Sequence, residues 1–167
     1  MRNYLVEGVS GAGKTSVCRE LRRRGYHAIN GDRELAYQGD PMSGEPREGV
    51  TGLAVHEHHI WHVEEVKSLV ADHRNSMTFF CGGSRNFTDF IDLFDEVFVL
   101  TIDHSTLLRR LGERSADEWG GSGRQAEREL IERLHCTGAD VPSTGVKIDA
   151  TLSLSAVVDE ILRRVKI

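Results

Sequence analysis

The strongest chemical signal in the sequence is the run Gly8-Val9-Ser10-Gly11-Ala12-Gly13-Lys14-Thr15, which fits the phosphate-binding pattern G-x-x-x-x-G-K-[ST]. Its glycines let the backbone curl so that successive N–H groups form a nest for an anion. A helix beginning at Lys14 adds the positive end of its dipole. Lys14 brings charge to the outer phosphates, and the Thr15 hydroxyl is suited to Mg²⁺. The residues expected to hold the triphosphate are Gly8, Ser10, Gly11, Ala12, Gly13, Lys14, Thr15 and Ser16.

The segments that flank this loop favour a real site over a chance glycine-rich turn. Residues 3–6 are a short apolar run of strand character, and residues 15–24 carry Val17, Cys18 and Leu21 at helical spacing. A strand, a loop and a helix in that order are the setting that the motif requires.

A second candidate, Asp32, follows a short apolar strand expected over residues 26–29. Ligands of open α/β sheets bind at the carboxyl ends of the strands, so Asp32 is predicted to bind Mg²⁺ or an acceptor hydroxyl. The alternative role is a helix N-cap. Arg47 lies in a glycine- and proline-rich segment, 37–50, which we expect to be a mobile loop. Arg47 meets an anionic acceptor there or is merely exposed.

The third expected strand, residues 77–81, is nearly all apolar and ends in Gly82 and Gly83, which allow a ligand to approach the backbone. Arg85 follows. These three residues, with Asp32 and Arg47, are the predicted acceptor site.

Arginines gather after a fourth expected strand, residues 97–102. Asp103 or Ser105 can cap the next helix, which carries Arg109, Arg110 and Arg114. The glycine-rich segment 115–123, which includes Trp119, then suits a short lid that closes over phosphates.

One long helix is expected over residues 53–73, with Ile60, Val63, Val66, Leu69 and Val70 facing inward. Histidines crowd its first half. His58, His62 and Glu65 would share a face and could hold a metal, but the pattern H-E-x-x-H is absent. A polar or acceptor-facing helix surface is the favoured interpretation, and the sequence does not reveal a role for residues 56–62.

Strands alternate with helices to the end of the chain, with a helix at 124–135, a strand at 146–148, a turn at 149–151 and a helix at 154–165. This alternation predicts a three-layer α/β/α fold of the P-loop nucleoside triphosphate hydrolase type. Its five-stranded parallel sheet would carry helices on both faces. The 167 residues suit one domain, 1–167.

The composition narrows the class of protein. Hydrophobic residues make up 39% and charged residues 28%, as in ordinary globular domains, and the net charge of -5 gives no support to nucleic-acid binding. Three widely spaced cysteines suggest reduced thiols and a cytoplasmic protein. We expect no signal peptide and no membrane span, and either a monomer or a homodimer.

The layout of nearly the whole chain resembles the small P-loop kinases: nucleoside monophosphate kinases, shikimate kinase and gluconate kinase. Arg110-Leu111-Gly112-Glu113-Arg114 is similar to the R-L-x-x-R run that opens the adenylate kinase lid. Asp149-Ala150-Thr151 is similar to the loop beside the donor base. The resemblance implies that Arg110 and Arg114 contact phosphates, and that Asp149, Ala150 and Thr151 contact ATP.

The third strand matches two families in part. Cys81-Gly82-Gly83 is similar to the Gly-Gly-Gly of shikimate kinase, and Cys81 to Arg85 is similar to the Asp-Gly-Phe-Pro-Arg of adenylate kinase, with Cys81 in place of the aspartate. Asp32 falls where shikimate kinase has an aspartate near magnesium and the acceptor hydroxyl. The whole chain looks most like adenylate-kinase-like ATP-binding proteins of bacteria.

The leading hypothesis is an ATP- and Mg²⁺-dependent kinase for a small acceptor, most readily a nucleoside or nucleotide. Lys14, Asp32, Arg110 and Arg114 would be catalytic, and Thr15 and Asp32 would hold Mg²⁺. The alternatives are a hydroxyl kinase of the shikimate or gluconate type and a regulatory ATPase switch without a small acceptor. The sequence names neither the acceptor nor the choice of ATP over GTP.

Overall fold

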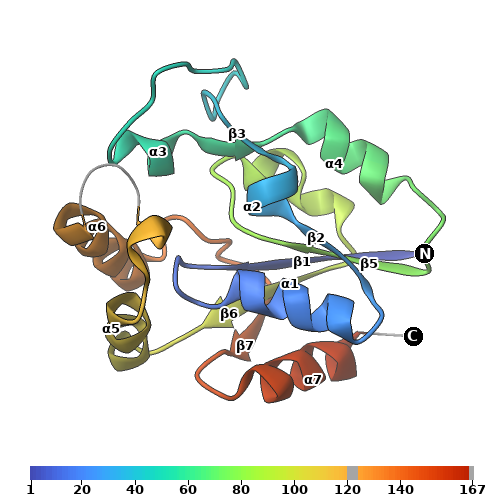
Figure 1. Cartoon of the computed structure of the whole chain (residues 1–167). Helices are drawn as coiled ribbons and strands as arrows, with labels where there is room; N and C mark the ends of the chain where they lie inside the picture. The colour runs from blue at the N-terminus through green and yellow to red at the C-terminus, as the bar shows by residue number, and fades with distance from the viewer. Residues whose placement is uncertain (120–123, 166–167) are drawn as a thin grey trace.

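The computed structural model describes residues 1–119 and 124–165. Five parallel strands form the central sheet in the order β2-β5-β1-β6-β7 (Figure 1), which confirms the predicted fold class. These strands are β1 (Arg2–Gly8), β2 (His27–Asn30), β5 (Met77–Cys81), β6 (Glu96–Thr101) and β7 (Val146–Asp149).

Outside residues 31–34 and 53–73, the helices follow the predicted alternation. The helices are α1 (Lys14–Arg23), α2 (Gly31–Glu34), α3 (Ala54–Glu57), α4 (Val63–Val70), α5 (His104–Gly112), α6 (Arg124–Thr137) and α7 (Leu154–Arg164), with short 3₁₀ turns η1 (Phe87–Asp89), η2 (Ile91–Leu93) and η3 (Ala116–Glu118). The carboxylate of Asp103 caps α5 by accepting from the N–H of Thr106 at 2.7 Å, as expected.

Successive side chains of the central strand β1 point to opposite faces of the sheet, so the core has one part on each face. Tyr4 and Val6 of β1 are buried with residues of α1 and α7, whereas Leu5 is buried on the opposite face with Trp61 and Phe80. In Figure 1, α1 and α7 cover one face and α4 the other. Because all the strands are parallel, their carboxyl ends and the loops that follow lie along one edge of the sheet.

The long helix expected over residues 53–73 is wrong, because the segment is broken into α3, the strand β4 (His59–Trp61) and α4. β4 pairs antiparallel with β3 (Ala36–Gln38), with Tyr37 opposite Ile60. The backbone of Trp61 in β4 is hydrogen-bonded by the side chain of Asn86 and not by another strand. The Asn86 Oδ1 accepts from the Trp61 N–H at 3.0 Å, and the Asn86 Nδ2 donates to the Trp61 carbonyl at 3.1 Å. These distant partners outweigh the helical spacing of the apolar residues.

The two-stranded sheet of β3 and β4 also corrects two other expectations: the loop over residues 37–50 and the helix face that could hold a metal. The segment 37–50 begins inside β3, and Gly39 forms a further bridge to Pro46. His58 bonds the Gly39 carbonyl at 3.1 Å, whereas the His62 ring stacks on Tyr37 at 3.9 Å. Within the parts of the chain that the structure describes, no three His, Cys, Asp or Glu side chains form a candidate metal site.

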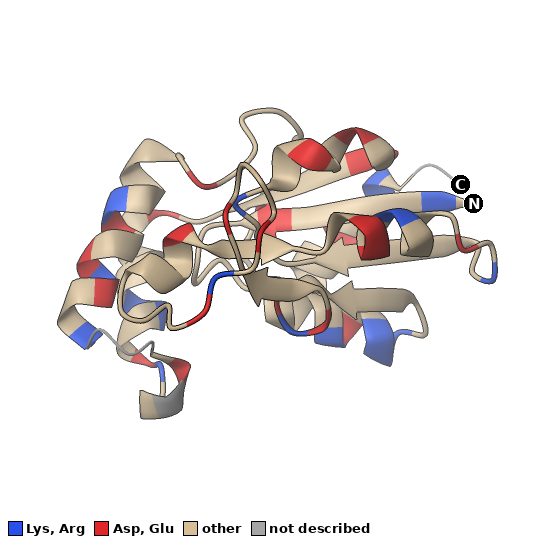
Figure 2. Cartoon of the chain, turned by 90° about the horizontal axis from the view of Figure 1, so that it is seen from above, with Lys and Arg blue, Asp and Glu red and all other residues tan. Residues whose placement is uncertain are grey.

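The predicted lid, 115–123, is described only as far as residue 119, and residues 120–123 lie outside the described parts. η3 occupies its first half, and the Trp119 ring lies 5.2 Å from the Arg114 guanidinium carbon and 5.5 Å from that of Arg124. Lys and Arg are interspersed with Asp and Glu in Figure 2. Among the described helices, none has the length and apolar character needed to cross a bilayer.

Gly31 is expected to be intolerant of any side chain. A Cβ at this position would lie 2.0 Å from Cζ2 of the fully buried Trp61, so Gly31→Ala forces the ring or the backbone to move. We expect the free energy of unfolding to fall by about 2 kcal/mol in urea titrations. Gly112→Ala is the matched control, because a Cβ there meets nothing within 4 Å, and equal stability of the two variants would contradict this account.

Candidate functional site

The glycine-rich loop and the first turn of α1 line a cavity of about 560 Å³, here called the P-loop cavity. Gly11 and Gly13 have φ values of 92° and 104°, in the region that favours glycine, so the loop depends on them. No side chain caps α1 at its N-cap residue Gly13, which leaves N–H groups of the first turn for an anion. The residues from Ser10 to Ser16 that we predicted to bind the triphosphate all line this cavity.

Three predicted cations converge on the same loop. Lys14 Nζ donates to the carbonyls of Gly8 at 2.5 Å and Val9 at 3.2 Å. Arg110 donates to the carbonyls of Ala12 at 3.1 Å and Ala150 at 2.6 Å. These bonds place concentrated positive charge beside the anion nest.

Arg114, just after α5, donates to the Ser10 hydroxyl at 2.8 Å. Burial lowers the pKa values of Arg110 and Arg114, because a guanidinium removed from water loses hydration. Both arginines line the P-loop cavity, where a phosphate would restore charge balance.

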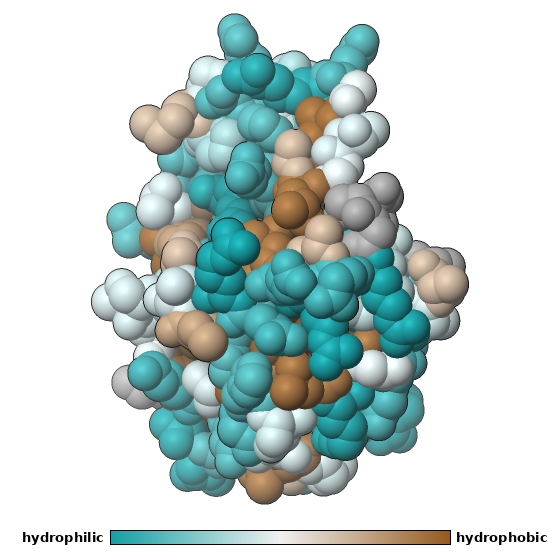
Figure 3. Space-filling view, turned by 90° about the vertical axis from the view of Figure 1, so that its left-hand side faces the viewer, coloured by the Kyte–Doolittle hydropathy of each residue, from teal (hydrophilic) through white to brown (hydrophobic). Residues whose placement is uncertain are grey.

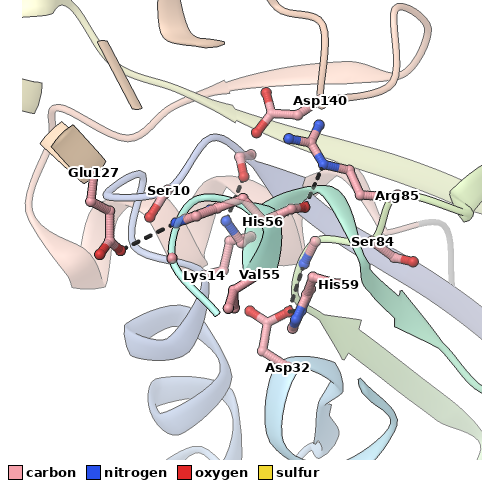
Figure 4. A pocket seen from close by; sticks show the side chains of 13 residues that line it. Ser10, Lys14, Asp32, Val55, His56, His59, Ser84, Arg85, Glu127 and Asp140 are labelled. Carbon is pink, nitrogen blue, oxygen red and sulfur yellow. Dashed lines mark hydrogen bonds and ion pairs between the residues drawn. The ribbon is translucent and has the colours of Figure 1, made fainter. Parts of the chain in front are cut away.

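A second cavity of about 290 Å³ adjoins the first and shares Ser10, Lys14 and Asp32 with it. Figure 4 shows its labelled side chains converging from α2, α3, β4 and the loop after β5. Gly83 and Arg85 line it as predicted, and Arg85 Nε donates to the His56 carbonyl at 2.9 Å. The two cavities therefore meet where Lys14 and Asp32 lie.

Asp32 is anchored at this junction from two directions. One carboxylate oxygen accepts from the Gly83 N–H at 3.0 Å and lies 3.0 Å from Nε2 of His59. Burial alone would raise the pKa of Asp32, but the hydrogen bond from His59 and the charge of Lys14 outweigh it and hold the pKa below its usual value. Asp32 is the second residue of α2 and not its N-cap, which is Asn30.

Glu7 is a site residue that our sequence analysis missed. It is 1% exposed at the end of β1, where its carboxyl accepts from the N–H groups of Gly8 at 3.0 Å and Ser84 at 3.3 Å. Burial raises its pKa to about 8, against the opposing charge of Lys14. The signal was available as the single acidic residue between the apolar run 4–6 and the glycine-rich loop.

Three more cavity residues come from segments to which the sequence assigned no role or only an uncertain one. His56 of α3 lies 3.2 Å from the Glu127 carboxylate of α6, so this pair joins two helices beside the second cavity. Asp140 reaches the same cavity from the loop between α6 and β7. Sequence order gives no indication that these residues meet.

Four predicted site residues are not brought to either cavity lining. Arg47 is half-exposed and pairs with Asp40 at 2.6 Å. Gly82 is covered by the side chains of Asp32 and Trp61, which a Cβ at this position would meet at 2.8 Å and 2.6 Å. Asp149 and Thr151 hydrogen-bond each other in a turn. Of the predicted donor-base loop, Ala150 lines the P-loop cavity, and the apolar Leu152, Leu154 and Val157 extend it.

The buried Glu7 carboxyl should make stability depend on pH. Its folded pKa of about 8 exceeds the ordinary 4.5, so between these values the folded state holds a proton that the unfolded state releases. The free energy of unfolding should fall as pH rises through this window, by about 1 kcal/mol per unit from Glu7. Glu7→Gln, compared with the exposed control Glu64→Gln in urea titrations at pH 5 to 8, should flatten the profile; parallel profiles for wild type and Glu7→Gln would refute the assignment.

Comparisons with known proteins agree with this geometry in fold. A gluconokinase from Sinorhizobium meliloti 1021 is 19% identical, with a TM-score of 0.58 over 97% of this chain and 90% of its own. A sugar kinase from Janibacter sp. HTCC2649 is 15% identical, with a TM-score of 0.60 over 98% and 93%. A deoxyadenosine kinase from M. mycoides is 16% identical, with a TM-score of 0.50 over 98% of both chains.

These three proteins are small-molecule kinases by their descriptions, and this chain shares their fold at low sequence identity. No curated protein sequence matches this chain significantly. The sequence profile of an AAA domain family does match, over residues 5–132, which include the glycine-rich loop, Asp32 and both arginines. The chain therefore belongs to this AAA domain family, and its fold is that of the P-loop small-molecule kinases.

Proposed function

We propose that the protein is an ATP- and Mg²⁺-dependent kinase that transfers the terminal phosphoryl group to a hydroxyl of a small acceptor. The observation that carries the proposal is the junction of two cavities at Ser10, Lys14 and Asp32. A nucleotide in the P-loop cavity would direct its outer phosphate toward this junction, and an acceptor in the second cavity would face it. A site that only bound nucleotide would not need the second cavity.

The cations of the P-loop cavity suit the charge of phosphoryl transfer. Lys14 and Arg110 donate to carbonyl groups of the loop, and Arg114 donates to the Ser10 hydroxyl. On binding, these side chains would exchange neutral partners for phosphate oxygens. Fixed charges around the moving phosphoryl group are the main source of rate acceleration in this chemistry.

Asp32 would receive the acceptor's proton. As the new O–P bond forms and the bond to the ADP leaving oxygen breaks, the hydroxyl proton would pass to the Asp32 carboxylate and then to water. The lowered pKa of Asp32 keeps it ionised before the step, and its bonds to His59 and Gly83 fix its direction. Glu7, protonated below its pKa of about 8, is the less suitable base.

Two oxygen-bearing side chains of the P-loop cavity fit a magnesium ion. The Thr15 hydroxyl and the Asp32 carboxylate line the same cavity, and Mg²⁺ prefers few protein oxygens together with water and phosphates. When bound, Mg²⁺ would neutralise charge on the outer phosphates. Thr15 and Asp32 are the residues that would hold it.

The decisive experiment is the rate of ADP formation with and without acceptors, measured beside ATP binding. A kinase consumes ATP faster when its acceptor is present. ATP binding with slow turnover that no acceptor accelerates would instead favour a regulatory ATPase switch.

Lys14→Ala should reduce phosphoryl transfer by at least about 10²-fold, because a fixed positive charge at the transferred group is lost. The fold should survive, since Lys14 bonds loop carbonyls and does not pack in the core. Circular dichroism and steady-state rates test both statements, with the exposed Lys67→Ala as the control. Turnover near wild type in a folded Lys14→Ala protein would reject the proposed role.

Asp32→Asn should lower turnover by about 10²-fold or more, because it removes the base and keeps the size of the side chain. ATP affinity should change little, because the glycine-rich loop holds the phosphates. Asp92→Asn, at an exposed position in η2, is the matched control. A folded Asp32→Asn protein with full turnover would remove Asp32 from the mechanism.

A further inference from the structure

The lining of the second cavity combines apolar surface with charged groups of both signs. Carboxylates come from Asp32, Glu127 and Asp140, imidazoles from His56 and His59, and cations from Lys14 and Arg85. Val55 is the one aliphatic side chain larger than a methyl group among the described lining residues, and no Phe, Tyr or Trp is among them. Figure 3 shows that the end of the molecule near α3, α5 and α6 is largely hydrophilic.

The nearest aromatic rings are already used in packing. Trp61 is fully buried and stacks on Phe90 with ring centroids 5.5 Å apart, and Tyr37 stacks on His62. A nucleobase needs an apolar face or an aromatic ring on which to stack. The described lining offers no indole, phenol or phenyl ring, and its two imidazole rings, His56 and His59, are held by Glu127 and Asp32. It is therefore a poor stacking surface for the base of a nucleoside.

The charges also oppose an acceptor that already carries a phosphate. Beyond Lys14, which belongs to the P-loop, Arg85 is the one arginine or lysine in the described lining. Its Nε donates to the His56 carbonyl, and the N–H groups of its two terminal nitrogens are further donors. Glu127 and Asp140 line the same cavity, and together with Asp32 they make three carboxylates against two cations in the described lining. A phosphate or carboxylate group would meet these like charges at close range.

Asp140 supplies a specific attachment point for a ligand. Its Oδ1 is buried and has no hydrogen-bond partner within the described residues, which is costly for a carboxylate oxygen. A ligand hydroxyl would donate to it, while Arg85 and the imidazoles would donate to the ligand's own oxygens. A hydroxyl group both donates and accepts, so a set of hydroxyls matches this mixed lining.

We propose that the acceptor is a compact, uncharged polyhydroxylated molecule, a free sugar or polyol, with Asp140 and Arg85 as specificity-determining residues. This inference rests on the kinase function proposed above. It favours a hydroxyl kinase over the nucleoside or nucleotide acceptor that the sequence alone suggested. The cavity of about 290 Å³ sets a compact size for the part of the acceptor that enters it.

A panel of acceptors tests the proposal on the whole protein with ATP and Mg²⁺. The neutral arm contains ribose, glucose, glycerol, sorbitol and inositol; the charged arm contains gluconate and shikimate; the nucleoside arm contains adenosine, thymidine and AMP. ADP formation should accelerate with a member of the neutral arm. Faster turnover with gluconate, shikimate, a nucleoside or AMP would overturn this inference and leave the kinase function standing.

Failure of both proposals has a different signature. If ATP raises the melting temperature, which reports binding to the folded state, but no arm of the panel accelerates ADP formation, the kinase function and the acceptor class are both rejected. The two failures are therefore distinguishable in one set of measurements.

Asp140→Asn tests the role of the carboxylate directly. It should raise the KM for the neutral acceptor by about 10-fold, the size expected for a weakened hydrogen bond to a charged group, with little change in kcat or in the KM for ATP. Asp92→Asn is the control, and Glu127→Gln with the control Glu129→Gln serves if Asp140→Asn does not fold. An unchanged acceptor KM in a folded variant, or an equal loss of kcat, would contradict a specificity role.

Discussion

Two carboxyl groups tie three loops together at the carboxyl edge of the sheet, and both cavities depend on these ties. Glu7, at the end of β1, accepts N–H bonds from Gly8 and Ser84, so the glycine-rich loop and the loop after β5 share one buried acceptor. Asp32, after β2, accepts from Gly83 in that same loop. Because this position buries the Glu7 carboxyl, its pKa is raised to about 8.

The two carboxyls have opposite electrostatic settings although they lie near the same lysine. Glu7 is enclosed, so burial dominates and favours its neutral form. Asp32 is partly exposed at 31% of its side chain, and His59 and Lys14 reverse the effect of burial. Such a difference can separate a structural acid from a reactive base in one site, and it supports the base role proposed above for Asp32.

The sequence predicted the features that depend on neighbouring residues. The five strands, the phosphate loop and the position of Asp32 follow from a local motif and from apolar runs, and the structure contains all of them. The failures are non-local. β4 exists because β3 and Asn86 complete its hydrogen bonds, and Arg47 turns away because Asp40 binds it. Glu127 and Asp140 reach the second cavity from far along the chain, which no spacing rule reports.

The central position of β1 has a consequence for how the protein is made. The chain begins with this strand, yet its partners are distant: Arg2 lies opposite Met77 of β5, and Tyr4 lies opposite Glu96 of β6. During synthesis the apolar strand must therefore wait until β6 has left the ribosome before both of its edges are covered. Contacts of such long sequence separation slow folding and expose strand edges to other chains. We expect newly made chains to depend on chaperones during this interval, and truncations before β6 to aggregate.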